Sequence, residues 1–159
     1  MEQHATSEVV GRRVLDAPPE EAWKAWADPD HVRRWWGPTG FTCPSAEMDF
    51  REGGSSLVCM RAPAEYGGMD LYNTWTYHRI TPHEQIEFDL AFTDEDRAPI
   101  PSPPGVPEAV RHVVTLTAVD GGRTEMVVTE YGYTLEEASQ RSSTGLEQCL
   151  TKMVAIYAR

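Results

Sequence analysis

The apolar residues of this 159-residue chain change their spacing twice, and these changes limit the folds that it can adopt. From Cys43 onward they alternate with polar residues, which is typical of strands that bury one face. Just before this stretch, and again from Thr134 to the C-terminus, the spacing is helical. One-sided strands favour an antiparallel sheet that is covered on a single face. The sequence therefore predicts an α+β fold, with a sheet packed against helices from both ends of the chain.

The first forty residues predict one strand followed by two short helices. The segment "SEVVGRRVLDA" (7–17) is rich in β-branched residues and is stopped by two prolines. A helix should follow, because proline is tolerated in a first turn and two glutamates favour the positive end of the helix dipole. Asp28, followed by a proline, predicts the start of a second helix. That helix carries the adjacent Trp35 and Trp36 and ends at a Gly-Pro pair.

The later segments predict a meander of strands and one closing helix. "QIEFDLAF" (85–92) alternates polar and apolar residues over its first six positions and is the clearest strand. Asp-Gly-Gly at 120–122 is a strong hairpin signal, and pairing its two strands through that loop sets His112 opposite Glu130. Thr134 and the glutamate three residues later have capping-box spacing, so we expect a long amphipathic helix to begin there.

Charge and composition exclude several classes of function. The net charge of -11 repels nucleic acid and anionic lipid surfaces, and nowhere do about 20 apolar residues run together as a membrane span requires. Cys43, Cys59 and Cys149 have no CxxC spacing, which indicates reduced, packed thiols. The histidines are scattered, and the phosphate-binding and nucleophile-elbow motifs are absent from the sequence. We therefore expect a cytoplasmic protein that needs no metal and no cofactor.

Three segments carry a resemblance to a known family. "APPEEAWKAWADPDHVRRWWGP", "MDFREGG" and "TLEEASQRSSTGLEQCLTKM" occur in this order and resemble the activator of heat-shock protein 90 ATPase homologue family, within the START-like (SRPBCC) superfamily. The resemblance covers about residues 9–153. It implies a helix-grip fold, in which a curved antiparallel sheet wraps around a long C-terminal helix, as one START-like domain over residues 1–159. Members often have a Gly-Trp pair in the last helix, where this chain has Gly145 and Leu146.

The superfamily commonly encloses an apolar cavity, so the resemblance implies binding of a small apolar or aromatic molecule between the sheet and the last helix. The side chains expected to line that cavity are Trp36, Phe50, Met60, Trp75, Tyr77, Phe88, Phe92, Met126, Leu146, Leu150 and Met153. His112 and Glu130 lie on the same apolar face, where they could be its polar anchors. The acidic, proline-rich segment 94–107 is the best candidate for a gate.

Other interpretations stay open from sequence alone. His112 and Glu130 could simply satisfy each other at the edge of the sheet, and the tryptophan pair could be ordinary core. An enzyme could use the same cavity for a cyclisation, dehydration or hydrolysis, with His112 and Glu130 as acid and base. The domain could instead dock on a chaperone, which predicts a contiguous exposed apolar patch. We rank ligand binding first, catalysis second and a chaperone partner third, in a monomer or a homodimer.

Overall fold

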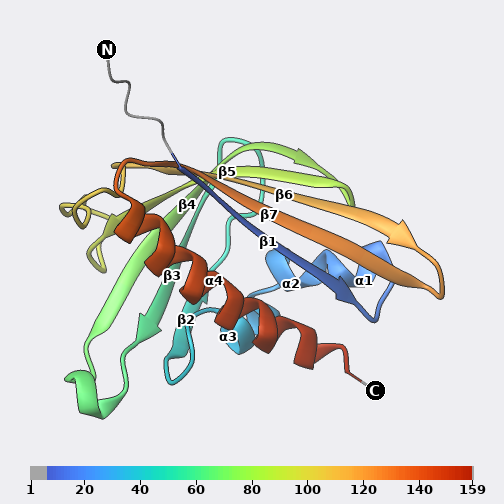
Figure 1. The fold of residues 1–159 in the computed structure, drawn as a ribbon, viewed down its shortest axis with the longest axis horizontal. Helices are drawn as coiled ribbons and strands as arrows, with labels where there is room; N and C mark the ends of the chain where they lie inside the picture. Colours follow the sequence, from blue (N-terminus) through green and yellow to red (C-terminus); the bar gives the residue numbers. More distant parts are fainter. Residues whose placement is uncertain (1–6, 159) are drawn as a thin grey trace.

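The computed structural model describes residues 7–158 and has a curled antiparallel sheet that wraps around one long helix (Figure 1). The strands are β1 (Ser7–Leu15), β2 (Thr42–Glu47), β3 (Ser55–Arg61), β4 (Asp70–Thr81), β5 (Gln85–Thr93), β6 (Val110–Val119) and β7 (Arg123–Tyr133). They follow the order β1-β7-β6-β5-β4-β3-β2 across the sheet. The long helix is α4 (Glu136–Ile156), which runs along the concave side (Figure 1). The predicted helix-grip fold is confirmed.

Short helices fill the space between β1 and β2. They are α1 (Pro19–Ala22), α2 (Lys24–Ala27) and α3 (Pro29–Trp35), and a 3-10 turn, η1 (Ala64–Tyr66), joins β3 to β4. The first predicted helix is thus two four-residue pieces that meet at Trp23. The second begins as predicted, because the Asp28 carboxylate accepts a hydrogen bond of 2.8 Å from the Asp30 amide. It ends at Trp35, so Trp36, which was expected within it, lies just beyond the helix.

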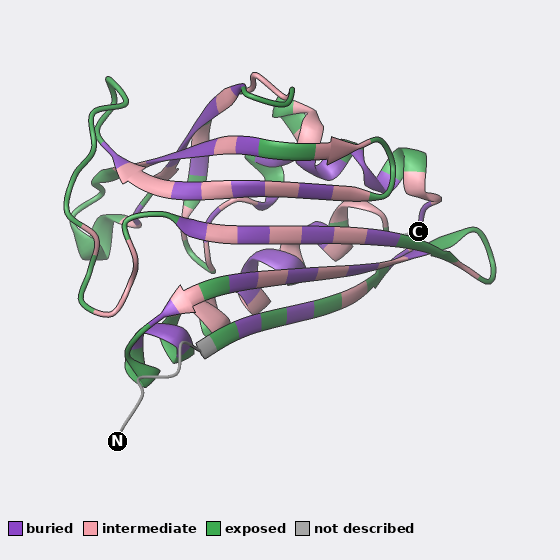
Figure 2. Ribbon diagram, turned by 90° about the horizontal axis from the view of Figure 1, so that it is seen from above, coloured by how far each residue is buried: buried purple, intermediate pink, exposed green. Residues whose placement is uncertain are grey.

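The alternation of apolar and polar residues in the central strands corresponds to an alternation of buried and less buried side chains. Buried and half-exposed residues alternate along β6 and β7, and Figure 2 shows this banding. The alternation that starts at Cys43 continues through Met48 and Phe50, but β2 ends at Glu47. Both side chains still pack against the core, so their apolar character reflects burial after the strand has ended.

Helix α4 approaches the sheet most closely at β1. A Cβ atom on Gly11 would come within 2.7 Å of one Leu150 methyl carbon and 2.9 Å of one Leu146 methyl carbon. The absence of a side chain at Gly11 therefore lets these two leucines rest on the β1 backbone. The predicted capping box does not form, since the helix begins at Glu136 after Leu135, which makes no side-chain cap.

One lysine ties α4 to the loop between α3 and β2. The Lys152 ammonium donates to the carbonyl oxygens of Gly37, Pro38 and Phe41 at 2.8, 3.1 and 3.0 Å. Burial lowers the pKa of this ammonium from its ordinary value. The Thr39 amide also donates to the Gln148 side chain at 3.1 Å. This loop is therefore fixed to the helix on both sides of its turn.

Replacing Lys152 by Met keeps the apolar stem of the side chain but removes the ammonium donor from three carbonyl groups, of which Pro38 still accepts from the Phe41 amide at 2.9 Å. We expect the free energy of unfolding to fall by about 1–3 kcal/mol, the usual cost of unsatisfied buried polar groups. Urea denaturation at neutral pH measures this loss. Lys24→Met is the matched control, because Lys24 is exposed and pairs with the exposed Glu21 at 3.3 Å, and it should cost less than about 0.5 kcal/mol. Equal losses in both variants would contradict the assigned role.

Candidate functional site

A cavity of about 200 Å³ lies between the sheet and α4. On the sheet side, β5 contributes Phe88, Leu90 and Phe92, while Val110 and Val128 come from the neighbouring strands β6 and β7. These positions share one face because strand residues two apart point the same way. The sheet side of the cavity is therefore apolar over most of its area.

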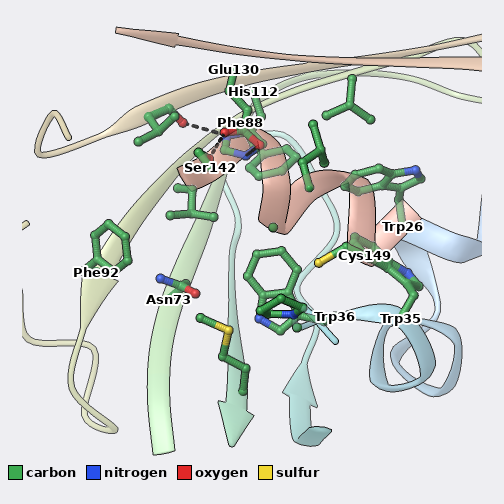
Figure 3. Close-up of a pocket in the computed structure, with 18 of the residues that line it drawn as sticks. Trp26, Trp35, Trp36, Asn73, Phe88, Phe92, His112, Glu130, Ser142 and Cys149 are labelled. Carbon is green, nitrogen blue, oxygen red and sulfur yellow. Dashed lines mark hydrogen bonds and ion pairs between the residues drawn. The ribbon is translucent and has the colours of Figure 1, made fainter. Parts of the chain in front are cut away.

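The opposite side is built by the helices and by the loop tied to Lys152. Trp26, Trp35 and Trp36 reach the cavity from α2 and from the end of α3, and Leu146 and Cys149 reach it from α4 (Figure 3). Burial raises the pKa of the Cys149 thiol to about 11, so this thiol is neutral at physiological pH. Aromatic rings thus line the cavity from both layers.

The two adjacent tryptophans have different surroundings. Trp35 is 1% exposed, and its indole nitrogen donates to the Ala25 carbonyl at 2.6 Å. Trp36 follows the helix in an extended conformation and is half-buried. Its ring is nearly perpendicular to that of Trp35, at 85° and 5.8 Å between centroids, and lies 5.2 Å from that of Trp75. Both line the cavity, but among the described residues only the Trp35 nitrogen has a hydrogen-bond partner.

His112 and Glu130 face each other across β6 and β7, in the register predicted from the hairpin. The His112 Nε2 lies 3.5 Å from a Glu130 carboxylate oxygen, and both residues are buried, at 6% and 5% exposed. The His112 Nδ1 donates to the Val110 carbonyl at 2.9 Å. The ring stacks on Phe88 at 4.7 Å and 18°. The imidazole is therefore held from three sides at one end of the cavity.

Two hydroxyl groups complete this polar end. The other Glu130 oxygen accepts from the Tyr133 hydroxyl at 2.5 Å and from the Ser142 hydroxyl at 2.6 Å. Burial alone would raise the pKa of the Glu130 carboxyl, but the charge of His112 and these hydrogen bonds lower it below its ordinary value. Burial and the adjacent Glu130 raise the pKa of Tyr133. We call His112, Glu130, Tyr133 and Ser142 the polar cluster.

The polar cluster does not have the arrangement of a hydrolytic triad. A serine nucleophile needs a hydrogen bond to its base, which a third group then orients. Here the Ser142 hydroxyl donates to Glu130, and the His112 Nδ1 donates to a backbone carbonyl. Over residues 7–158 there is also no group of three or more His, Cys, Asp or Glu side chains that could hold a metal ion.

The structure gathers only part of the residues that sequence predicted for the cavity. Those that line it are Trp36, Met60, Phe88, Phe92, His112, Glu130 and Leu146. Those that lie elsewhere are Phe50, Trp75, Tyr77, Met126, Leu150 and Met153. Phe88 stacks on Trp75 at 5.1 Å and Phe50 packs against Tyr77 at 5.0 Å, which covers both rings. That any of these residues binds a ligand stays a prediction.

Several residues that line the cavity were not predicted to do so. They are Trp26, Trp35, Gly37, Pro38, Asn73, Leu90, Val110, Val128, Tyr133, Ser142, Gly145 and Cys149. The spacing of the sequence could have indicated two of these residues. Ser142 lies one helical turn before Leu146, and Asn73 lies on the face of β4 that carries Trp75.

Segment 94–107, expected as a gate, contributes no residue to the cavity wall. It is attached to the start of α4, where the Thr134 amide donates to the Gly105 carbonyl at 2.9 Å. A Cβ atom on Gly105 would lie 2.6 Å from Leu135, so this loop packs closely on the helix. None of the helices within residues 7–158 is long and apolar enough to span a membrane.

Comparisons with known proteins agree with this architecture. The family model described as "Activator of Hsp90 ATPase homolog 1-like protein" matches residues 16–158. Protein CV1439 from Chromobacterium violaceum is 25% identical, with a TM-score of 0.76 over 95% of this chain and 97% of that chain. A protein from Arthrobacter aurescens is also 25% identical, with a TM-score of 0.77 over 97% of this chain and 86% of that chain.

The AHSA1 protein from Silicibacter pomeroyi, at 18% identity, shares the fold with a TM-score of 0.76 over 94% of this chain and 96% of that chain. No curated relative matches the sequence. The family match extends over nearly the whole chain and includes every strand and helix that lines the cavity. This chain therefore belongs to the Activator of Hsp90 ATPase homolog 1-like family, within the START-like (SRPBCC) superfamily.

Proposed function

We propose that this protein binds a small apolar or aromatic molecule in the cavity between the sheet and α4. The observation that carries the proposal is an apolar cavity with aromatic walls and one polar cluster. Binding sites for small molecules are concave and mainly apolar, with a few placed polar groups that orient the ligand. Aromatic walls also favour a ring, because ring pairs attract beyond the area that they bury.

The volume of the cavity limits the size of this molecule. An engineered apolar cavity of about 150 Å³ in another protein binds benzene. By the same scale, the cavity of about 200 Å³ holds a compact molecule rather than a long acyl chain. We infer that the ligand has about eight non-hydrogen atoms, enough for one substituted ring.

The two other classes of function have less support. A cyclase or hydrolase would need a nucleophile or base aimed at a substrate, and the hydrogen atoms of the Tyr133 and Ser142 hydroxyls point within the cluster. A chaperone partner would need a contiguous apolar patch. The exposed large apolar residues instead come from β1, the β3–β4 connection, the loop after β5, β7 and the start of α4.

Cys149 offers a direct test of the cavity, because its sulfur points into the open space (Figure 3). Cys149→Phe should fill the space with a ring, Cys149→Met should fill it in part, and Cys149→Ala should enlarge it. We expect ethylbenzene, acetophenone and naphthalene to bind the wild type and the Ala variant. Affinity should fall in the Met variant and by at least tenfold in the Phe variant. Isothermal titration calorimetry measures the affinities.

Thermal denaturation of each variant without ligand shows whether it is folded. If the Phe variant is unfolded, the Met variant still provides the comparison, since Met adapts to irregular spaces. A wild-type protein that binds none of the three probes would overturn the proposal. So would folded Met and Phe variants that bind them as tightly as the Ala variant does.

A further inference from the structure

The polar cluster at one end of the cavity has no hydrogen left to donate. The His112 Nδ1 hydrogen goes to the Val110 carbonyl, and Nε2 faces the Glu130 carboxylate. Tyr133 and Ser142 have one hydroxyl hydrogen each. These two hydrogens serve three contacts, two to Glu130 and one of 2.8 Å between the hydroxyls themselves. In each arrangement that keeps these contacts, both hydrogens are used inside the cluster.

The polar cluster can still accept hydrogen bonds from a ligand. A carboxylate has about four lone-pair positions, and each hydroxyl oxygen can accept as well as donate. Glu130 uses one oxygen for the two hydroxyls and turns the other toward His112 at 3.5 Å, which is too long for a strong hydrogen bond. Glu130 and Ser142 both line the cavity. This end therefore suits a group that donates, such as a hydroxyl or an amine.

A second polar position on the cavity wall has a donor that no described residue uses. Asn73 lines the cavity and is 1% exposed, and its side-chain nitrogen has no hydrogen-bond partner among the described residues. The indole nitrogen of Trp36, another residue of the wall, also has none. Buried donors are nearly always paired, so two unpaired donors on one wall require an explanation. An acceptor oxygen on the ligand would pair with them.

The two positions lie apart. Figure 3 shows Asn73 and Trp36 on one side of the cavity and the polar cluster on the other, with aromatic side chains between. The strand pairing agrees with this separation. Asn73 pairs with Phe92 on β5, whereas His112 pairs with Phe88, which lies four residues earlier on the same strand. A ring with substituents at opposite ends fits such a space.

We infer that the ligand is a single-ring aromatic molecule with an acceptor oxygen at one end, which Asn73 binds, and a hydroxyl or amine at the other, which Glu130 and Ser142 accept. This inference rests on the proposed function. It adds which polar groups the ligand carries and which end of the cavity each group faces. The Asn73 carboxamide selects for the oxygen, and the polar cluster selects for the donor. The aromatic walls contribute affinity but little selection between such ligands.

Four probes of nearly equal shape test the two ends separately. Ethylbenzene has no polar group, acetophenone adds an acceptor, 4-ethylphenol adds a hydroxyl, and 4-ethyltoluene replaces that hydroxyl by a methyl group. Their dissociation constants are measured by calorimetry for the wild type and for Asn73→Leu, which keeps the size of the side chain without its donor. Asn73→Ala is the second variant if the leucine disturbs folding.

For the acceptor end, we compare the ratio of the ethylbenzene and acetophenone dissociation constants in the two proteins. This ratio should fall about tenfold in Asn73→Leu, because only acetophenone loses a partner. The ratio of the 4-ethyltoluene and 4-ethylphenol constants should stay the same. For the donor end, the wild type should bind 4-ethylphenol at least tenfold more tightly than 4-ethyltoluene.

The outcomes separate this inference from the proposed function. If all four probes bind and the acetophenone ratio is unchanged by Asn73→Leu and Asn73→Ala, the inference is overturned and the cavity remains a ligand site. Equal or weaker binding of 4-ethylphenol than of 4-ethyltoluene overturns the donor end in the same way. If no probe binds the wild type, the proposed function itself fails.

Discussion

Replacing Trp35 by Ala should lower the free energy of unfolding by about 3–5 kcal/mol, the usual cost of removing a large buried aromatic side chain. The Trp35 ring lies 4.7 Å from Trp26 and 6.2 Å from Trp75, so its loss leaves a hole between the short helices and the sheet. It also removes the hydrogen bond to the Ala25 carbonyl, which joins α3 to α2. Urea denaturation followed by far-ultraviolet circular dichroism measures the loss without relying on tryptophan emission.

The adjacent tryptophan is the matched control for this experiment. Trp36 is half-buried and its indole nitrogen has no partner in the described part of the chain. Trp36→Ala should therefore cost clearly less stability than Trp35→Ala, although it removes the same side chain one residue away. Equal losses would mean that the two rings have the same role in the core, and the distinction drawn between them would be wrong.

Replacing Glu130 by Ala should be about as destabilising, by about 3–5 kcal/mol at neutral pH, because it removes a buried carboxylate that lies 3.5 Å from the His112 ring. It also leaves the Tyr133 and Ser142 hydroxyls without their acceptor. Glu137→Ala is the control. Glu137 is exposed on α4 and pairs with Arg141 at 3.5 Å, so its removal should cost about 0.5 kcal/mol or less.

The dependence of this loss on pH has a definite sign. The fold lowers the pKa of Glu130 below its ordinary value of 4.5, so below that value the unfolded chain binds more protons at this group than the folded protein does. The stability contributed by Glu130 is complete above pH 4.5 and is lost as the pH falls through the lower pKa of the folded state. The difference between wild type and Glu130→Ala should therefore shrink on acidification. A constant difference would contradict the ionised state assigned to Glu130.

The fold could be predicted from sequence because it depends on periodicity, which each segment shows by itself. The strands around "QIEFDLAF" and the hairpin at 120–122 needed no knowledge of the rest of the chain, and the pairing of His112 with Glu130 followed from them. Local details were less certain. The break at Trp23 and the end of β2 before Met48 depend on contacts with distant segments, which local spacing does not encode.

The wall of the cavity was predicted only in part. Alternation predicts on which face of a strand a residue lies, but not how deeply that residue is buried. Trp75 and Tyr77 share a face with Asn73, yet Phe88 and Phe50 cover them while Asn73 reaches the cavity. Along α4, Leu146 reaches the cavity, and Leu150, one turn later, packs on Gly11. These differences depend on which side chains from other segments cover each residue, and local spacing does not encode those contacts.

The Lys152 hydrogen bonds have a consequence for the thermodynamics of binding. They hold Gly37 and Pro38, which form part of the cavity wall, to the same helix that contributes Cys149. Two parts of the wall are thus connected before any ligand arrives. A preorganised wall loses little conformational entropy on binding. Differences in affinity between ligands should accordingly report their own shape and hydrogen bonds, rather than the cost of closing the protein around them.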